Sequence, residues 1–161
     1  MSSQPQRLLL IEDNQGDVDL VRLKLLEGNA EFEVYCADRL SVGLAALTKE
    51  TPVVVLLDLY LPDSRGVDTL HAVIDRTAGV PVVVITGTDD DELALHAVSS
   101  GAQDYLVKGT FDGKRLGHSL RFAIERQILM SSFAADKKQQ PRRSATREPH
   151  AYEDTSALVP D

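Results

Sequence analysis

The sequence is poor in cysteine and in aromatic residues, and both shortages limit what the protein can be. A single cysteine, Cys36, excludes an internal disulfide and a cysteine-rich zinc site. Its position in the alternating segment 32–36 predicts a buried structural thiol. With no tryptophan and 5% aromatic residues, the core must be packed mainly by valine, leucine and alanine.

Long hydrophobic runs and excess positive charge are also missing. No run approaches the roughly 20 apolar residues that a membrane-spanning helix requires. Residues 1–7 lack the apolar stretch of a signal peptide, so we expect a soluble, cytoplasmic protein without membrane association. The formal net charge of −8 argues against a nucleic-acid-binding surface, which would need a basic stripe.

One short hydrophobic segment dominates the middle of the chain. Residues 53–57 are valine and leucine without a polar interruption, which predicts a strand buried on both faces, and Asp58 follows directly. A carboxylate at the end of such a strand is desolvated, which is costly unless a cation or hydrogen-bond donors meet it. The alternative is that Asp58 only caps the next turn, as aspartate often does.

A unit of strand followed by helix occurs five times between residues 7 and 130. This alternation predicts an α/β protein with a parallel sheet and right-handed crossovers. The expected strands are residues 8–11, 32–36, 53–58, 82–85 and 104–107. The expected helices begin at Asn14, Ser41, Gly66, Thr88 and Asp112, and the last of them ends at Met130.

Two helices carry features that bear on function. Asn14 is the expected N-cap of the first helix, and Asp17, three positions later, completes a variant of the capping box. The fourth helix has a thin inward face, and a helix that buries little area shifts at low cost. The residues of that face are Leu93, Ala94, Ala97 and Val98.

Polar or charged residues follow four of the five expected strands. Because the carboxyl ends of parallel strands form one edge of the sheet, we expect these residues to meet where ligands bind in such folds. They are Glu12, Asp13, Asp58, Thr86 and Lys108. Clustered carboxylates repel one another, and a hard dication with oxygen ligands, Mg²⁺ or else Mn²⁺, is the usual remedy.

The same residues can hold a phosphoryl group. Its three oxygens can contact the metal, the Lys108 ammonium and the Thr86 hydroxyl, one each. Asp58, ionised and central, is then a nucleophile that forms an acyl phosphate without a general base.

With these motifs the chain resembles the response-regulator receiver domains of two-component signalling, over about residues 7–127. The matching parts are residues 12–14, Asp58, residues 61–66, Thr86-Gly87 and residues 101–108. The resemblance implies a flavodoxin-like, doubly wound (βα)5 fold with strand order 2-1-3-4-5. It also implies phosphorylation by a sensor histidine kinase or a histidine phosphotransfer protein, and it allows dimerisation on activation.

The resemblance assigns the metal ligands and the phosphoacceptor. Asp58 accepts the phosphoryl group, and Asp13 and Asp58 bind Mg²⁺ directly. Glu12 binds the ion through water, and the backbone carbonyl of Tyr60 is a further ligand. Beyond its own phosphorylation and dephosphorylation, the protein is expected not to be an enzyme.

The resemblance also assigns a switch. Thr86 and Lys108 contact the phosphoryl group, and Tyr105 changes rotamer with it. Because Thr86 precedes the weakly held fourth helix and Tyr105 lies on the adjacent strand, we expect the fourth helix, fifth strand and fifth helix to form the output surface. Receivers usually have a cis proline after the lysine, and this chain has Gly109. A cis bond before a non-proline residue costs about 2.5–4 kcal/mol, so we expect a trans bond and a less fixed Lys108.

The chain is expected to divide at residues 6 and 130. Residues 1–6 are a flexible N-terminus and residues 7–130 the receiver domain. Residues 131–161 are a disordered polar tail, because they have too few apolar residues to offset the entropy of ordering. Since no further domain motif follows, the chain is either a stand-alone receiver or a receiver without its output domain.

The same residues are less typical of three other functions. A phosphorylation-independent adaptor keeps the fold, but such receivers usually lose part of the acidic set that is intact here. A nucleotide binder needs a glycine-rich turn after the first strand, where this chain has the acidic residues of segment 12–15. A haloacid-type phosphatase has a second aspartate two residues after its nucleophile, where this chain has Tyr60.

Overall fold

The computed structural model describes residues 4–77 and 79–139 of the 161-residue chain. Five strands form one parallel sheet in the order β2-β1-β3-β6-β7. They are β1 (Gln6–Ile11), β2 (Phe32–Ala37), β3 (Val54–Asp58), β6 (Val82–Thr86) and β7 (Asp104–Val107). Because β4 and β5 form a separate hairpin, this is the predicted 2-1-3-4-5 order of a doubly wound sheet.

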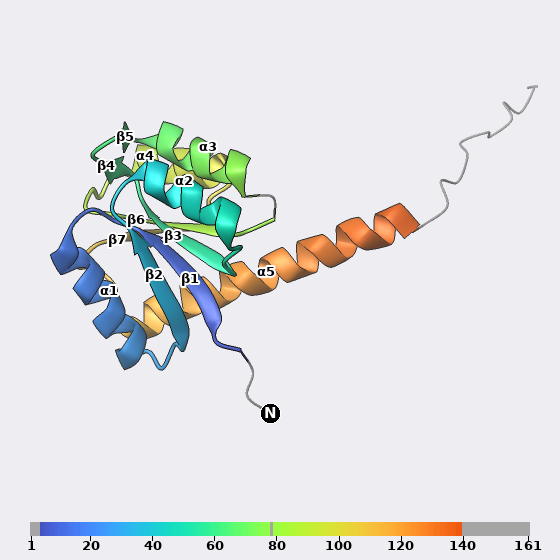
Figure 1. The fold of residues 1–161 in the computed structure, drawn as a ribbon, viewed down its shortest axis with the longest axis horizontal. Helices are drawn as coiled ribbons and strands as arrows, with labels where there is room; N and C mark the ends of the chain where they lie inside the picture. The colour runs from blue at the N-terminus through green and yellow to red at the C-terminus, as the bar shows by residue number, and fades with distance from the viewer. Residues whose placement is uncertain (1–3, 78, 140–161) are drawn as a thin grey trace, which may run out of the picture.

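Helices cover both faces of the sheet (Figure 1). One face carries α1 (Gln15–Glu27) and α5 (Gly113–Gln139). The other carries α2 (Leu40–Lys49), α3 (Val67–Arg76) and α4 (Asp91–Ser99). The chain moves from β1 outward to β2 and then back past β1 to β3. Since each crossover is right-handed, this reversal of direction puts helices on opposite faces.

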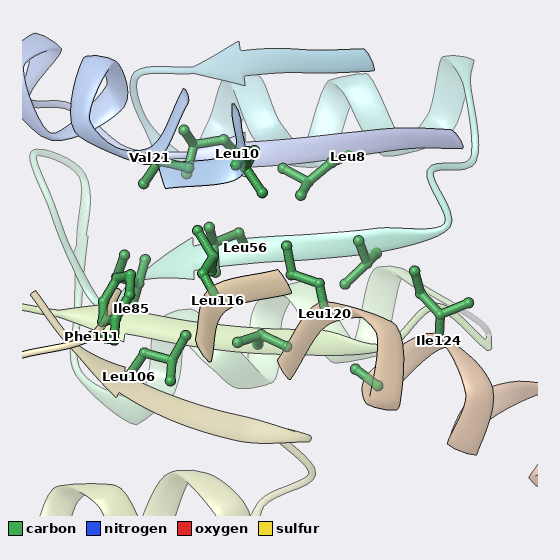
Figure 2. Packing of buried hydrophobic residues seen from close by; sticks show 14 of the residues in the cluster. Leu8, Leu10, Val21, Leu56, Ile85, Leu106, Phe111, Leu116, Leu120 and Ile124 are labelled. Atoms are coloured by element: carbon green, nitrogen blue, oxygen red, sulfur yellow. The ribbon is translucent and has the colours of Figure 1, made fainter. Parts of the chain in front are cut away.

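The core is split by the sheet into two hydrophobic clusters, one under each helix layer. The central strands β3 and β6 are buried at every residue, as the uninterrupted valine and leucine runs predict. In Figure 2, Leu116 and Leu120 of α5 lie over Leu56, Ile85 and Leu106 of the sheet. This packing places the ends of the central strands, and the residues that follow them, at one edge.

The loop after Asp58 is held by contacts that the sequence analysis did not predict. It contains a short antiparallel hairpin, β4 (Tyr60–Leu61) with β5 (Ser64–Arg65). Within it, the Asp63 carboxylate accepts hydrogen bonds from the backbone N–H groups of Leu40 (2.8 Å) and Ser41 (2.9 Å). The hydrogen bonds from Ser41 and Leu40 hold the pKa of Asp63 below its ordinary value. A side chain from this loop therefore caps α2, whose own N-cap residue, Arg39, makes no such bond.

Two predicted burial patterns are wrong. Cys36 is exposed, because β2 is an edge strand and the side chain beside the thiol is the exposed Arg22, whose guanidinium is 3.4 Å from Sγ. Val98 is also exposed (48%), so Ala97 is the only fully buried residue of α4. The inward face of α4 is thus thinner than predicted, because the helix turns Val98 toward solvent.

The last helix is longer than predicted. It continues to Gln139 instead of ending at Met130, so residues 131–139 are helical and not disordered. Alanine, lysine and glutamine favour helix, and each residue added to an existing helix gains a hydrogen bond. Residues 128–136 are all exposed, and α5 extends beyond the sheet in Figure 1. Residues 1–3 and 140–161, to which the predictions of flexibility and disorder also refer, lie outside the described residues.

The sheet begins slightly earlier than expected, since β1 starts at Gln6 within the predicted flexible N-terminus. Across residues 4–77 and 79–139, no helix combines the length and the apolar character needed to cross a membrane.

Candidate functional site

The predicted site residues come together at the carboxyl edge of the sheet. Glu12 follows β1, Asp58 ends β3, Thr86 ends β6, and Lys108 follows β7. The register aligns these ends, because Asp58 is paired with Ile85, the residue before Thr86, and Thr86 is paired with Val107, the residue before Lys108. Glu12, Asp58 and Thr86 are buried, at 3%, 4% and 0% exposure.

Three carboxylates at this edge can share one cation. Glu12, Asp13 and Asp58 each offer an oxygen, and the three oxygens lie within 4.8 Å of one another. Oxygen ligands without histidine or cysteine suit Mg²⁺, so the residues present fit the predicted ion. Asp13 is exposed, which leaves the cluster open to solvent on one side.

Tyr60 contacts the site through its backbone. Its N–H donates to Asp58 Oδ1 at 3.0 Å, while the residue as a whole is 42% exposed. This bond fixes one oxygen of Asp58. Coordination by the Tyr60 carbonyl, like water-mediated coordination by Glu12, stays a prediction.

Lys108 lies among the carboxylates. Its Nζ is 2.7 Å from Glu12 Oε2, 2.9 Å from Asp58 Oδ2 and 2.9 Å from Asp17 Oδ2. An ammonium has three N–H donors, so each carboxylate can accept one. Burial disfavours the charge of Lys108, but the bonds to the three carboxylates outweigh burial and raise its pKa above the ordinary value. The part played by Asp17 was not predicted.

The first turn of α1 explains how Asp17 reaches the lysine. Asn14 caps the helix as predicted, with its Oδ1 accepting from the N–H of Asp17 at 3.0 Å. The reciprocal bond of a capping box is absent, because the N–H of Asn14 donates to Glu12 Oε1 at 3.0 Å. The prediction of Asn14 as N-cap is therefore confirmed, but the prediction that Asp17 completes a capping box is wrong. The Asp17 carboxylate is turned toward Lys108 instead.

Glu12 is the carboxylate whose titration the site changes most clearly. Burial raises the pKa of Glu12 to about 7, and the nearby Asp58 adds to this effect. The hydrogen bonds from Lys108 and from the N–H of Asn14 oppose it without cancelling it. A proton can therefore occupy Glu12 near neutral pH when no metal ion is bound.

Thr86 and Tyr105 are connected through the loop that leads to α4. The N–H of Thr88 is 3.5 Å from the Thr86 hydroxyl, and the Tyr105 hydroxyl donates to the Thr88 carbonyl at 2.8 Å. The loop is longer than predicted, because α4 begins at Asp91 with Asp90 as its N-cap. Tyr105 is half-buried, and burial raises its pKa.

Gly109 follows Lys108 through a trans peptide bond, as expected. Its φ of +81° lies in the left-handed region that glycine adopts readily. The backbone of Lys108 itself is held to β6, since its N–H donates to the Thr86 carbonyl at 2.8 Å. Any looseness of the lysine is therefore confined to its side chain and to the residues after it.

The fold and this edge together define a flavodoxin-like α/β domain with an acidic, oxygen-rich ligand site and one lysine. The sequence profile of the response regulator receiver domain matches residues 8–121. The chain therefore belongs to the response regulator receiver domains of two-component signal transduction.

Similar proteins support this assignment. The chain is 32% identical over 144 residues to the transcriptional regulatory protein DpiA of Escherichia coli K12, covering 84% of this chain and 60% of DpiA. It thus spans less than two-thirds of that regulator. In fold it is similar to a CheY-like receiver domain from Methanospirillum hungatei JF-1, with 24% identity, a TM-score of 0.68, and coverage of 79% and 99%. It is also similar to the beryllofluoride-activated NtrC4 receiver domain dimer, with 24% identity, a TM-score of 0.67, and coverage of 75% and 98%.

The raised pKa of Glu12 predicts a pH-dependent stability in metal-free buffer. Between pH 4.5 and 7 the folded protein keeps a proton on Glu12 that the unfolded chain releases, so this contribution is full below pH 4.5 and is lost as pH rises through 7. Glu12→Gln should therefore be more stable than wild type at pH 8, by about 1 kcal/mol or more, and little different at pH 5. Urea unfolding with EDTA at both pH values measures this. The exposed Glu31→Gln is the control, and an equal effect of Glu12→Gln at both pH values would contradict the assignment.

The carboxylate cluster predicts that replacing Asp13 stabilises the metal-free protein but removes most of the stabilisation that Mg²⁺ gives. Without metal, Asp13→Ala should raise the melting temperature, because it removes a repelling charge. Mg²⁺ should stabilise wild type by mass action, and the variant should lose most of that gain. Melting curves across a Mg²⁺ series test both effects, with the exposed Asp75→Ala as control. A wild-type curve that does not move at about 20 mM Mg²⁺ would refute the metal site.

Proposed function

We propose that this chain is a Mg²⁺-dependent phosphorelay receiver that accepts a phosphoryl group on Asp58. The donor is a sensor histidine kinase or a histidine phosphotransfer protein. The observation that carries the proposal is the set of neighbours of Asp58, which are the Lys108 ammonium at 2.9 Å and the carboxylates of Glu12 and Asp13. A buried aspartate that only capped a turn would need neither a lysine nor two further acids beside it.

The chemistry follows from an ionised Asp58. A carboxylate oxygen attacks phosphorus, the phosphorus–nitrogen bond to the donor histidine breaks, and an acyl phosphate forms. No proton has to leave the nucleophile. When bound, Mg²⁺ supplies positive charge that offsets the clustered carboxylates and the phosphoryl oxygens. Lys108 moves its ammonium from the Asp58 carboxylate to a phosphoryl oxygen, and the Thr86 hydroxyl donates to another.

The partners follow from the same function. We place the protein in the cytoplasm, with a kinase or phosphotransfer protein upstream and a protein target downstream, and without direct nucleic-acid binding. The NtrC4 receiver forms a dimer in its activated state. Exposed apolar side chains on α4 and α5, namely Leu95, Val98 and Phe122, support dimerisation on activation here as well.

Phosphorylation of Asp58 is tested by intact mass. Incubation with acetyl phosphate and Mg²⁺ should add one phosphoryl group to wild type and none to Asp58→Asn, because the amide is not a nucleophile. EDTA should prevent the reaction. Asp75→Asn, which makes the same change at an exposed site on α3, should react like wild type.

The adaptor is the alternative that this experiment separates. If wild type binds Mg²⁺ but gains neither a phosphoryl group nor bound beryllofluoride, the chain is a phosphorylation-independent interaction module. Its acidic edge would then serve only to bind the ion.

The switch that we propose is carried by the path from Thr86 to Tyr105. A phosphoryl oxygen that draws the Thr86 hydroxyl toward Asp58 changes the loop whose Thr88 carbonyl accepts the Tyr105 hydroxyl. The loop leads directly into α4, which buries little beyond Ala97 and therefore shifts at low cost. Phosphorylation then redistributes two existing states, so the unphosphorylated protein visits the active form as a minority.

NMR with beryllofluoride and Mg²⁺ measures this switch. The largest shift changes should fall between residues 86 and 122, with α1 changing little beyond its first turn. Thr86→Ala should keep phosphorylation but remove the distant changes, because it lacks the hydroxyl that links the two. Thr48→Ala, at an exposed position on α2, is the control. Changes limited to the immediate phosphoryl contacts in wild type would rule out this output surface.

A further inference from the structure

Asp17 contacts the lysine of the site without belonging to the metal cluster. Its Oδ2 lies 2.9 Å from Lys108 Nζ, and its side chain is 32% exposed. The other two partners of that ammonium, Glu12 and Asp58, are both among the three carboxylates that can share a cation. Asp17 is thus the one of the three partners that neither the metal nor the phosphoryl group would take.

The backbone holds Asp17 in this position. Its N–H donates to the Asn14 side chain, which fixes the first turn of α1. Its carboxylate is not used for capping, because Glu12 accepts the N–H of Asn14 in its place. The acidic residue at the position that closes a capping box is therefore directed across the sheet edge at a residue 91 positions away.

The Lys108 side chain is restrained by its own backbone only at one end. Gly109 has no side chain to pack, and it adopts a φ of +81°. The Lys108 backbone is bonded to Thr86, but the long side chain has four rotatable bonds between that anchor and the ammonium. A carboxylate at the far end restricts those bonds more effectively than the backbone can.

We propose that Asp17 is a positioning residue that keeps the Lys108 ammonium beside Asp58 while the metal and the phosphoryl group displace its other two partners. Of the three donors of the ammonium, one stays on Asp17, and the donor released by Asp58 becomes free for a phosphoryl oxygen. The inference rests on the proposed phosphoacceptor function. It adds that a residue of the first turn of α1 sets how tightly the lysine binds a phosphoryl group.

The test compares Asp17→Asn with Asp19→Asn in the full chain. Both remove one negative charge from α1, but Asp19 is exposed and bonds only to Gln15 among the described residues, so it controls for charge alone. Beryllofluoride with saturating Mg²⁺ is the probe. Asp17→Asn should weaken its binding about tenfold relative to Asp19→Asn, the size expected for loss of a charge-assisted hydrogen bond that orients the lysine. Binding of Mg²⁺ alone should differ less between the two variants than beryllofluoride binding does, because Asp17 is not among the three carboxylates that can share the ion.

Rescue separates positioning from a structural role. Asp17→Glu keeps the charge and can reach Lys108, so it should recover most of the affinity, while the cap bond from the backbone N–H of residue 17 to Asn14 is available in both variants. Melting curves identify any variant that fails to fold, and Asp17→Ser, which retains a short polar side chain, then replaces Asp17→Asn in the comparison.

The outcomes distinguish this inference from the proposed function. Equal affinities for Asp17→Asn and Asp19→Asn would refute the positioning role. A higher affinity in Asp17→Asn would also refute it, because Asp17 would then compete with the phosphoryl group for the lysine. In either case, a phosphoryl adduct on wild-type Asp58 would leave the proposed function intact. If wild type forms no adduct and binds no beryllofluoride, the proposed function itself fails.

Discussion

The balance of charge at the carboxyl edge of the sheet is the constraint that governs the site. The carboxylates of Glu12, Asp17 and Asp58 lie within 3 Å of the Lys108 ammonium, and Asp13 adds a fourth negative charge beside Glu12 and Asp58. One ammonium cannot neutralise them, and burial makes the deficit more costly. The uncompensated charge therefore favours a proton on Glu12 or a bound dication. The position of the Lys108 ammonium then depends on whether a metal ion or a phosphoryl group is bound.

The fold creates this deficit by bringing distant parts of the chain to one place. Parallel strands in register deliver Asp58, Thr86 and Lys108 side by side, and the first turn of α1 adds Asp17 from across the edge. The surrounding structure is well fixed, with Asp63 capping α2 and helices packed on both faces. By contrast, α4 has a single fully buried residue, Ala97, and we propose that this helix responds to a change of charge at the edge.

Much of this arrangement could be predicted from local patterns in the sequence. Uninterrupted apolar runs predicted the central strands, because a strand buried on both faces tolerates no polar residue. The residue directly after each run was predicted to be at the site, since all parallel strands end at the same edge.

Patterns were less informative where an element has only one packed side. Cys36 on the edge strand and Val98 on α4 are exposed for that reason, and α5 continues past the sheet with residues 128–136 exposed.

Local pattern alone was enough to establish the class of fold, the acidic set and the lysine, because these depend on periodicity and on the residue that ends or succeeds each strand. Which carboxylate each polar group contacts was settled only by the folded arrangement of the chain. Asp17 looks like half of a capping box in the sequence, and Asp63 like a loop residue. In the structure Asp17 binds Lys108, and Asp63 caps a helix that begins 23 positions earlier. Such choices depend on which donors lie within about 3 Å in space, and spacing along the chain carries no information on that distance.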